Sequence, residues 1–353
     1  MGLSCGLVGL SGCGKTTIFN AITSAGATSF DGSEMNRAVV GVPDSRVPRL
    51  IDIYKPKKVV YATLQVIDIP GLSTGSTANQ GRGNKLLGHI KDVDALLYVV
   101  RCFNTERNDP KRDIETIDIE LMVADAQTLE NKIARLEKKA KGCKETAQEV
   151  ADCLEVKVAL EEGIVARKQN LSQRHIVSVF ECNLLSLKPV LYLANIASVV
   201  DLDSPQVRSV RSIAEAEASE MIAVCGRDEA EISQLEPEER PEFLRELGLL
   251  ESSMERLIRA AYRKLGLLSF FTAGEKEVHV WTCRQGDRAP VAAGRIHSDM
   301  ESGFIRMEVI GYQDLITYGS EAAVARAGKQ RIEGKSYEVQ DGDIVFIRFS
   351  PPK

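Results

Sequence analysis

Short apolar runs of strand length recur along the first two thirds of the chain, and each ends at a glycine or a polar residue. The runs are Leu3–Gly9, Thr63–Asp68, Ala95–Arg101, Pro189–Asn195 and Met221–Cys225. Each is too short for a typical helix and rich in Val, Ile or Leu, which indicates a buried strand. Helical patterns alternate with these runs, notably over Lys15–Ala25 and Gln206–Ser219. The alternation predicts an α/β fold with a doubly wound, mainly parallel sheet.

A long stretch without proline interrupts this pattern between the third and fourth of those runs. Its first apolar stripe follows heptad spacing and consists of Met122, Leu129, Ile133, Leu136 and Ala140. After a break at Gly142, a second stripe consists of Val150, Leu154 and Val158. The two stripes predict an antiparallel helical hairpin, or short coiled coil, inserted into the α/β domain. A pair of ordinary packed helices is the alternative.

A β-rich segment begins near Leu267 and forms the last part of the chain. Its apolar runs are Glu277–Thr282, Gly303–Ile310 and Ile344–Phe349, separated by turn signals such as Gln285-Gly-Asp. Its length is sufficient for a small α+β domain. We therefore predict an α/β domain over 1–120 and 185–266, the inserted hairpin over 121–184, and the α+β domain over 267–353.

The composition is that of a folded protein. The chain has 353 residues, of which 44% are hydrophobic, and this excludes disorder for the chain as a whole. No apolar run approaches the length of a membrane-spanning helix, and the N-terminus lacks the pattern of a secretory signal, so we expect a cytoplasmic protein without a membrane partner. The eight cysteines have no spacing suited to zinc, and a disulfide framework is not expected.

The net charge of −5 excludes a uniformly basic coat, but the charge is segregated along the chain. Nine acidic and two basic residues lie within Asp228–Glu251, whereas six basic and two acidic residues lie within Glu130–Lys144. The basic cluster is either a solvated helix face or a surface that docks on RNA phosphates. In the second case the candidate contacts are Lys132, Lys138, Lys139 and Lys141.

The segment Gly9–Thr16 matches the phosphate-binding pattern G-x-x-x-x-G-K-[ST] and lies between a predicted strand and a predicted helix. The glycines allow backbone N–H groups to surround phosphates, while Lys15 supplies charge to the β and γ phosphates and Thr16 can bind Mg²⁺. The nucleotide-binding candidates in this loop are Ser11, Gly12, Cys13, Gly14, Lys15, Thr16 and Thr17.

A second phosphate-site motif follows about fifty residues later, where an apolar strand ends in Asp68-Ile-Pro-Gly71. Asp68 is placed to hold Mg²⁺, and the Gly71 amide to sense a γ-phosphate. The pairing favours the GTPase-like branch of P-loop proteins over kinases. Leu72 stands where Ras-like enzymes place a water-orienting Gln, so hydrolysis needs another group or is slow.

The nucleobase is expected at Asn195-Ile196-Ala197-Ser198. Guanine-specific proteins have N-K-x-D here, and their Asp accepts two hydrogen bonds from the guanine ring. Ser198 cannot make that bidentate contact, and Ile196 replaces the stacking Lys, so strict GTP specificity is not expected. Asn195 can still bond a purine edge, and Ile196 and Cys225 complete the predicted nucleotide site.

Two further side chains have alternative interpretations. His89 lies on a predicted helix after Asp68-x-x-Gly71 and has either a structural or switch role or a catalytic one. Cys13 lies among the backbone dipoles of the phosphate loop, which favour a thiolate. It is either a site of redox control or a passive small side chain.

These motifs resemble those of the YchF-type Obg-like ATPases, which are Obg-related, TRAFAC-class P-loop proteins. The most specific segments are Gly9–Thr17, Asp68–Leu72, Gly83–Ile90, Val100–Phe103, Phe271–Thr282, Ala289–Arg306 and Gly342-Asp343. The resemblance implies a G domain, an inserted helical hairpin and a C-terminal TGS domain. It also implies Mg²⁺-dependent hydrolysis of ATP in preference to GTP, binding to the ribosome (its large subunit or rRNA), and a monomer.

Three positions depart from the family pattern. Ser198 stands where the family usually has Glu, Gly32 stands where a magnesium-ligating Thr is usual, and the segment Asn104–Arg112 is short and lacks the family's catalytic His. These departures predict slow turnover. They leave two alternatives open, a nucleotide-gated RNA- or ribosome-binding module with little hydrolysis and a GTPase of the Obg type.

Overall fold

The structure is a computed structural model that describes residues 3–24, 27–31, 36–71, 82–103, 108–138, 143–236 and 238–350, without the side chains of 24, 27–31 and 82–86. The chain forms two compact units. The first contains Met1–Val40 and Gln65–Ala261, and the second contains Gly41–Leu64 and Tyr262–Lys353.

A seven-stranded sheet forms the centre of the first unit, in the order β2-β3-β5-β1-β6-β7-β8. The strands are β1 (Ser4–Val8), β2 (Ala27–Asp31), β3 (Asn36–Gly41), β5 (Thr63–Asp68), β6 (Ala95–Arg101), β7 (Val190–Asn195) and β8 (Met221–Val224). Strand β1 pairs in parallel with β5 and β6, and the parallel pairing continues through β7 to β8. The predicted α/β fold with a mainly parallel sheet is therefore confirmed.

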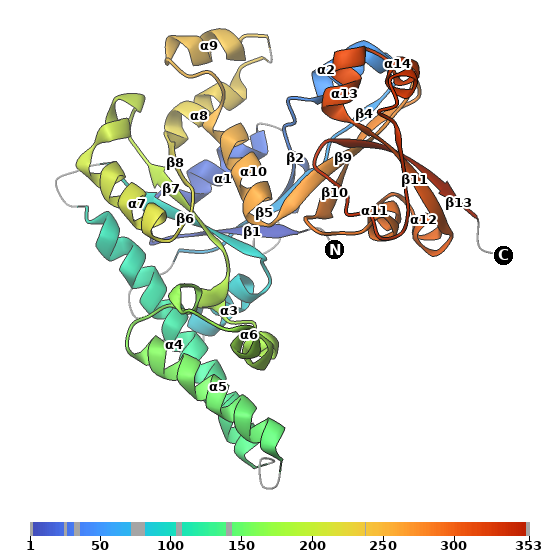
Figure 1. Cartoon of the computed structure of the whole chain (residues 1–353). Coiled ribbons are helices and arrows are strands. Elements are labelled where there is room, and N and C mark those ends of the chain that lie inside the picture. The colour runs from blue at the N-terminus through green and yellow to red at the C-terminus, as the bar shows by residue number, and fades with distance from the viewer. Residues whose placement is uncertain are drawn as a thin grey trace. The chain divides into compact units, whose positions relative to one another are not determined.

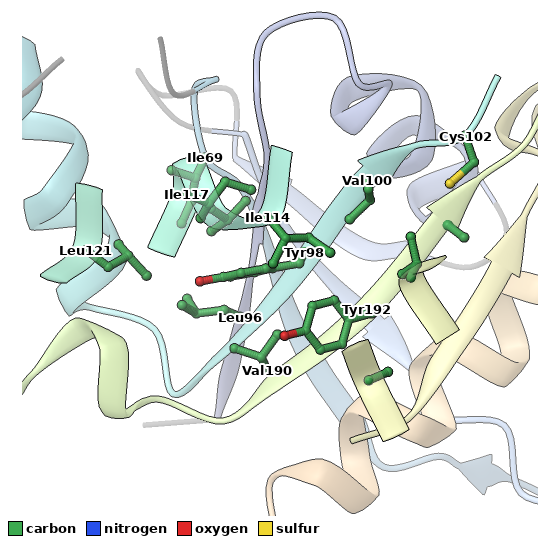
Figure 2. Close-up of a cluster of buried hydrophobic side chains, with 14 of the residues drawn as sticks. Ile69, Leu96, Tyr98, Val100, Cys102, Ile114, Ile117, Leu121, Val190 and Tyr192 are labelled. Atoms are coloured by element: carbon green, nitrogen blue, oxygen red, sulfur yellow. The ribbon is translucent and has the colours of Figure 1, made fainter. Parts of the chain in front are cut away.

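Helices cover this sheet, and an apolar core fills the space between the layers. The helices are α1 (Lys15–Ser24), α3 (Arg82–Lys91), α7 (Pro205–Ala216), α8 (Gly226–Gln234), α9 (Arg240–Glu246) and α10 (Ser253–Lys264). Figure 2 shows one core cluster, in which Tyr98 of β6 and Tyr192 of β7 lie edge to face with ring centroids 5.7 Å apart. Nearly every side chain of β6 and β7 is buried, as expected for central parallel strands.

The long helices α4 (Pro110–Glu137) and α5 (Lys144–Glu161) run side by side as a hairpin (Figure 1). Helix α4 starts earlier than predicted, because the Asp109 side chain accepts a hydrogen bond from Arg112 N and Pro110 occupies the first turn. Its first half packs on the sheet through Ile114, Ile117 and Leu121. The predicted boundary at residue 120 thus falls within one continuous helix.

The hairpin core confirms only part of the predicted stripe of α5, because Val150 packs against it whereas the next two positions do not. Met122, Leu129 and Ile133 of α4 are buried as expected, but Leu154 and Val158 of α5 are exposed. Instead Cys153, Val156 and Leu160 join the core. Helix α5 also contacts α6 (Gln173–Val179), so its buried positions are not set by α4 alone.

The second unit contains a six-stranded sheet in the order β12-β11-β13-β9-β10-β4. Its strands are β4 (Val59–Val60), β9 (Leu267–Ala273), β10 (Val278–Arg284), β11 (Phe304–Gly311), β12 (Arg331–Glu333) and β13 (Asp343–Phe349). The helices of this unit are α2 (Val47–Tyr54), α11 (Ala289–Ile296), α12 (Ser298–Ser302), α13 (Tyr312–Tyr318) and α14 (Glu321–Arg326). The predicted small α+β architecture is present in this segment.

The residues between Gly41 and Leu64 belong to this second unit, although they precede much of the first unit in the chain. Strand β4 adds to the edge of the sheet by pairing in parallel with β10. Arg46 forms ion pairs with Asp44 at 2.7 Å and with Asp341 at 2.8 Å, and its guanidinium lies over the Phe271 ring. The sequence patterns placed this segment in the α/β domain, because no local signal shows that it pairs with strands more than 200 residues away.

Candidate functional site

The phosphate-binding loop connects β1 to α1, as the motif requires. The Lys15 side chain is only 7% exposed, and its Nζ donates hydrogen bonds to Gly9 O and Leu10 O, each at 3.0 Å. These bonds hold the ammonium against the backbone of the loop. Several loop residues are exposed, namely Ser11, Gly12, Thr16 and Thr17. A phosphate entering the loop meets a cation that is already in place.

Thr16 and Asp68, which are predicted to bind Mg²⁺, lie next to each other. Their strands and loops meet because β1 and β5 are adjacent, with Leu7 opposite Asp68. The Thr16 hydroxyl donates to Asp68 Oδ2 at 3.1 Å. Burial raises the pKa of Asp68, while hydrogen bonds from Thr16 and Asn36 and the charge of Lys15 oppose that rise. A hydroxyl and a carboxylate at this separation are the oxygen donors that Mg²⁺ takes in phosphate sites.

Gly71 lies directly against the phosphate-binding loop. A Cβ at this position would lie 3.1 Å from Lys15 Nζ and 3.2 Å from Ser11 Cα. The end of the D-x-x-G motif therefore reaches the place where a γ-phosphate would meet the loop. Leu72 and Gly32 lie outside the described residues, so what was inferred for those positions stays a prediction.

Asn195, at the end of β7, connects the phosphate-binding loop to the first residue of α8. Its Nδ2 donates to Cys13 O at 2.9 Å, and its Oδ1 accepts from Gly226 N at 3.3 Å. The side chain is buried. The two hydrogen bonds show that Asn195 holds the phosphate-binding loop in place, which the sequence did not indicate, and its contact with a nucleobase stays a prediction.

The structure corrects the prediction for Ile196. Its side chain is 3% exposed and packs in the core cluster of the sheet, so it does not face an open base site. The replacement of a Lys by Ile here removes a base-stacking group without supplying another. Alternation along a strand cannot reveal this, because the residue lies just past the strand end.

Cys225 and Arg227 lie at the start of α8, next to the Asn195–Ser198 segment. Cys225 is buried, and its Sγ donates to Ala197 O at 3.2 Å. Arg227 reaches the same oxygen through Nη2 at 3.4 Å, and its side chain is exposed. Arg227 was not predicted as a site residue from the sequence. The only indication there is that it lies two residues after the end of the predicted strand Met221–Cys225.

His89 is half-buried in the last turn of α3. The switch or structural role and the catalytic role that we inferred for it both stay predictions. The part of the segment Asn104–Arg112 that the structure describes, 108–112, forms the start of α4 and contains no histidine.

The environment of Cys13 argues against a reactive thiolate. Burial raises the pKa of the Cys13 thiol, and this outweighs the charge and hydrogen bonds from Lys15 that lower it. All eight cysteines are free. Desolvation thus shifts the pKa of this thiol in the direction opposite to that expected from the loop dipoles.

Thiol alkylation tests this assignment. Cys143 is exposed before the first turn of α5, and hydrogen bonds from Thr146 lower its pKa. We expect iodoacetamide to alkylate Cys143 at least about tenfold faster than Cys13 in the native protein, as followed by peptide mass spectrometry. A Cys143→Ser variant is the control and should leave the slow Cys13 rate unchanged. Equal rates for the two thiols would contradict the assignment.

Of the predicted RNA-contacting lysines, the structure describes Lys132 and Lys138. Lys132 is buried, where its Nζ donates to Ser178 O at 2.6 Å and pairs with Glu149 at 2.7 Å. It stabilises the packing of α4, α5 and α6 and is not available to phosphates, so that prediction is wrong. Lys138 is exposed, whereas Lys139 and Lys141 lie outside the described residues.

The described part of the chain shows neither a membrane-spanning helix nor a clustered metal site. None of its helices is long and apolar enough to cross a membrane. Within the same residues, no group of three or more His, Cys, Asp or Glu side chains is placed to hold a metal ion. A two-ligand Thr–Asp site for Mg²⁺ does not need such a group.

Two family models match the chain. MMR_HSR1, described as "50S ribosome-binding GTPase", matches residues 4–139. YchF-GTPase_C, described as "Protein of unknown function (DUF933)", matches residues 267–350.

Full-length relatives and solved structures agree with these matches. The proteins called "Ribosome-binding ATPase YchF" from Bacillus subtilis and Haemophilus influenzae are 43% and 42% identical, and each alignment covers 99% of this chain and 100% of the relative. The structure of the Schizosaccharomyces pombe YchF GTPase has a TM-score of 0.88 at 34% identity, covering 98% of this chain and 97% of that one. A Pyrococcus horikoshii GTP-binding protein shares the fold, with a TM-score of 0.61 at 18% identity, over 99% of this chain and all of that one. The motif resemblance is thereby confirmed, and the chain belongs to the YchF family.

Proposed function

We propose that this chain is a magnesium-dependent P-loop nucleoside triphosphatase that hydrolyses the β–γ bond of ATP in preference to GTP and acts as a ribosome-associated switch in the cytoplasm. The observation that carries the proposal is the convergence of Lys15, Thr16, Asp68 and Gly71 on one loop. Relatives that cover the whole chain are named ribosome-binding ATPases, which supports both the reaction and the partner.

The residues of this site have separate tasks in the proposed reaction. Lys15 neutralises charge on the β and γ phosphates, and the exposed loop amides around it orient the triphosphate. Thr16 and Asp68 would hold Mg²⁺, which supplies charge neutralisation of the phosphates when bound. Asn195 keeps the loop in place through Cys13 O. Ser198, in place of the guanine-binding Asp, supports the preference for ATP.

A turnover assay tests the proposal. We expect phosphate release from ATP to exceed that from GTP, to require Mg²⁺, and to rise with added ribosomes. Replacing Lys15 with Met should lower kcat/KM by on the order of 100-fold or more, because a cation that stabilises transition-state charge is lost. Lys111→Ala, at an exposed lysine of α4, is the matched control and should change little.

The remaining alternatives predict other outcomes of the same assay. Nucleotide binding without phosphate release above the Lys15→Met background would instead indicate a nucleotide-gated binding module. Tighter binding of GTP than of ATP in calorimetry would indicate a GTPase of the Obg type. A failure to sediment with ribosomes in either nucleotide state would contradict the proposed partner.

A further inference from the structure

The helical part of the first unit contains a groove with an exposed apolar floor. It has a volume of about 830 Å³ and lies where α5, α6 and the 3-10 helix η4 (Phe180–Cys182) meet, with Lys132 of α4 at its base. Val177 and Phe180 line it and are 65% and 79% exposed. Large apolar side chains this exposed, gathered at one concave site, are typical of interaction surfaces.

The charges that line the groove are mainly negative. Four carboxylates take part, from Glu145, Glu149, Asp152 and Glu181, against two cations, Lys132 and Arg174. Lys132 pairs with Glu149 at 2.7 Å, and Arg174 pairs with Asp152 at 2.9 Å. These pairs leave the charges of Glu145 and Glu181 in excess.

The surroundings only partly reduce this excess. Glu181 forms an ion pair with Arg135 at 3.7 Å and a longer one with Lys132 at 4.0 Å, but its side chain is 73% exposed and remains accessible to a further cation. Next to the groove, His175 pairs with Glu155. The residues that line the groove therefore carry a net negative charge beside exposed apolar side chains, which favours a cationic partner over nucleic acid or anionic lipid.

Hydrogen bonds between the helices hold the walls of the groove together. The Asp152 carboxylate accepts hydrogen bonds from Ser178 Oγ at 2.8 Å and from Gln148 Nε2 at 2.9 Å, so it joins α6 to α5. Lys132 donates to Ser178 O and joins α4 to the same helix. Because its walls are tied together by buried polar contacts, the groove is formed before any partner arrives, which lowers the ordering cost of binding.

We propose that this groove binds a basic, amphipathic segment of a partner protein. Its aliphatic or aromatic side chains would cover Val177 and Phe180, and its Lys or Arg residues would pair with Glu145 and Glu181. This is the helix-in-groove mode of recognition, with charge selecting a cationic partner. The inference needs neither nucleotide hydrolysis nor ribosome binding, so it is independent of the proposed function.

Fluorescence anisotropy with the full chain tests the inference. The probes are a short labelled peptide of Lys and Leu at helical spacing, the same peptide with Glu in place of Lys, and labelled oligouridine. We expect the Lys/Leu peptide to bind more tightly than the other two and to weaken as salt rises. Phe180→Ser should weaken its binding about 10- to 100-fold, the range given by burial of one aromatic side chain.

Charge and position are tested by further variants. Glu181→Lys should weaken the Lys/Leu peptide and strengthen the Glu/Leu peptide. Val158→Ser and Glu137→Lys are the matched controls, because both residues are exposed on the hairpin helices outside the groove. Thermal melts should show all four variants folded, since each change is at the surface.

Several results would overturn the inference. One is equal affinity of wild type, Phe180→Ser and Glu181→Lys for the Lys/Leu peptide. Another is preferential binding of oligouridine that Phe180→Ser abolishes, which would make the groove an RNA site. A concentration-dependent dimer that Phe180→Ser dissociates would instead identify a second copy of the chain as the occupant.

Discussion

Replacing Arg167 with Met is expected to lower the free energy of unfolding by about 3–5 kcal/mol, one of the two largest effects that we predict. Arg167 lies in the 3-10 helix η3 (Ala166–Lys168), and its guanidinium is buried between two carboxylates. It donates to both oxygens of Asp118 on α4, at 2.9 and 2.8 Å, and to Glu217 after α7 at 2.9 Å. Its removal leaves two buried carboxylates without their main partner.

Lys168→Met is the matched control for this experiment. Lys168 also pairs with Glu217, at 2.6 Å, but its side chain is about half exposed. Its loss should cost at most about 1 kcal/mol, because water screens and replaces the pair. Chemical denaturation of both variants measures the difference. Similar losses of unfolding free energy in the two variants would show that burial does not make the Arg167 ion pairs more stabilising than the exposed Lys168 pair.

The effect of Arg167→Met should also depend on pH. Burial disfavours the charged form of Glu217, but the hydrogen bonds and charge of Arg167 outweigh it and lower the pKa of this carboxyl. A group with a lowered pKa contributes stability above its unfolded pKa and loses it as pH falls through the folded value. The destabilisation should therefore be largest near neutral pH and shrink in acid. A loss that stays constant down to acid pH would contradict the ion-pair explanation.

Replacing Gly14 with Ala is expected to weaken ATP binding by more than about 100-fold, the second large effect. Gly14 has φ +96°, and a Cβ there would overlap Asn195 Nδ2. The substitution combines left-handed strain of about 1–2 kcal/mol with displacement of Asn195 from its buried hydrogen bonds, which costs about 1–3 kcal/mol more. Calorimetry with a non-hydrolysable ATP analogue measures the loss.

Gly12→Ala separates the two causes. Gly12 also has a positive φ, +77°, but a Cβ there meets no atom within 4 Å. This variant carries the backbone strain alone, and its affinity should fall only about tenfold. If both variants lose the same affinity, the contact between Gly14 and Asn195 does not position the loop.

Much of the first unit could be predicted from the sequence, because its signals are local. The strands Thr63–Asp68 and Ala95–Arg101 match their observed bounds. The phosphate motif occurs within one turn between a strand and a helix, so Lys15 and Thr16 could be assigned without knowledge of the fold. Parallel strand order then brought Asp68 beside Thr16, as the second motif predicted.

Predictions that depended on packing partners were less successful. Lys132 has the sequence context of an exposed basic helix, yet Glu149 and Ser178 O from other helices enclose it. Leu154 and Val158 have regular helical spacing, yet both are exposed. Helix α5 packs against both α4 and α6, and a different set of its side chains is buried, namely Cys153, Val156 and Leu160. In both cases the burial or exposure of the side chain depends on another helix that packs against it, and local periodicity carries no information about that helix.

The sequence by itself determined that this is a P-loop α/β protein with an inserted helical pair and a β-rich C-terminal part, and it predicted a triphosphate site at Lys15, Thr16 and Asp68. It could do so because the phosphate-binding motif and the alternation of strands and helices can each be recognised within short segments of the sequence. Only the tertiary structure decided that Ile196 and Lys132 are buried, that Gly41–Leu64 packs with the C-terminal unit, and that Val177 and Phe180 line an acidic groove. Each of these depends on contacts between segments far apart in the chain, where burial and charge are set jointly by several elements.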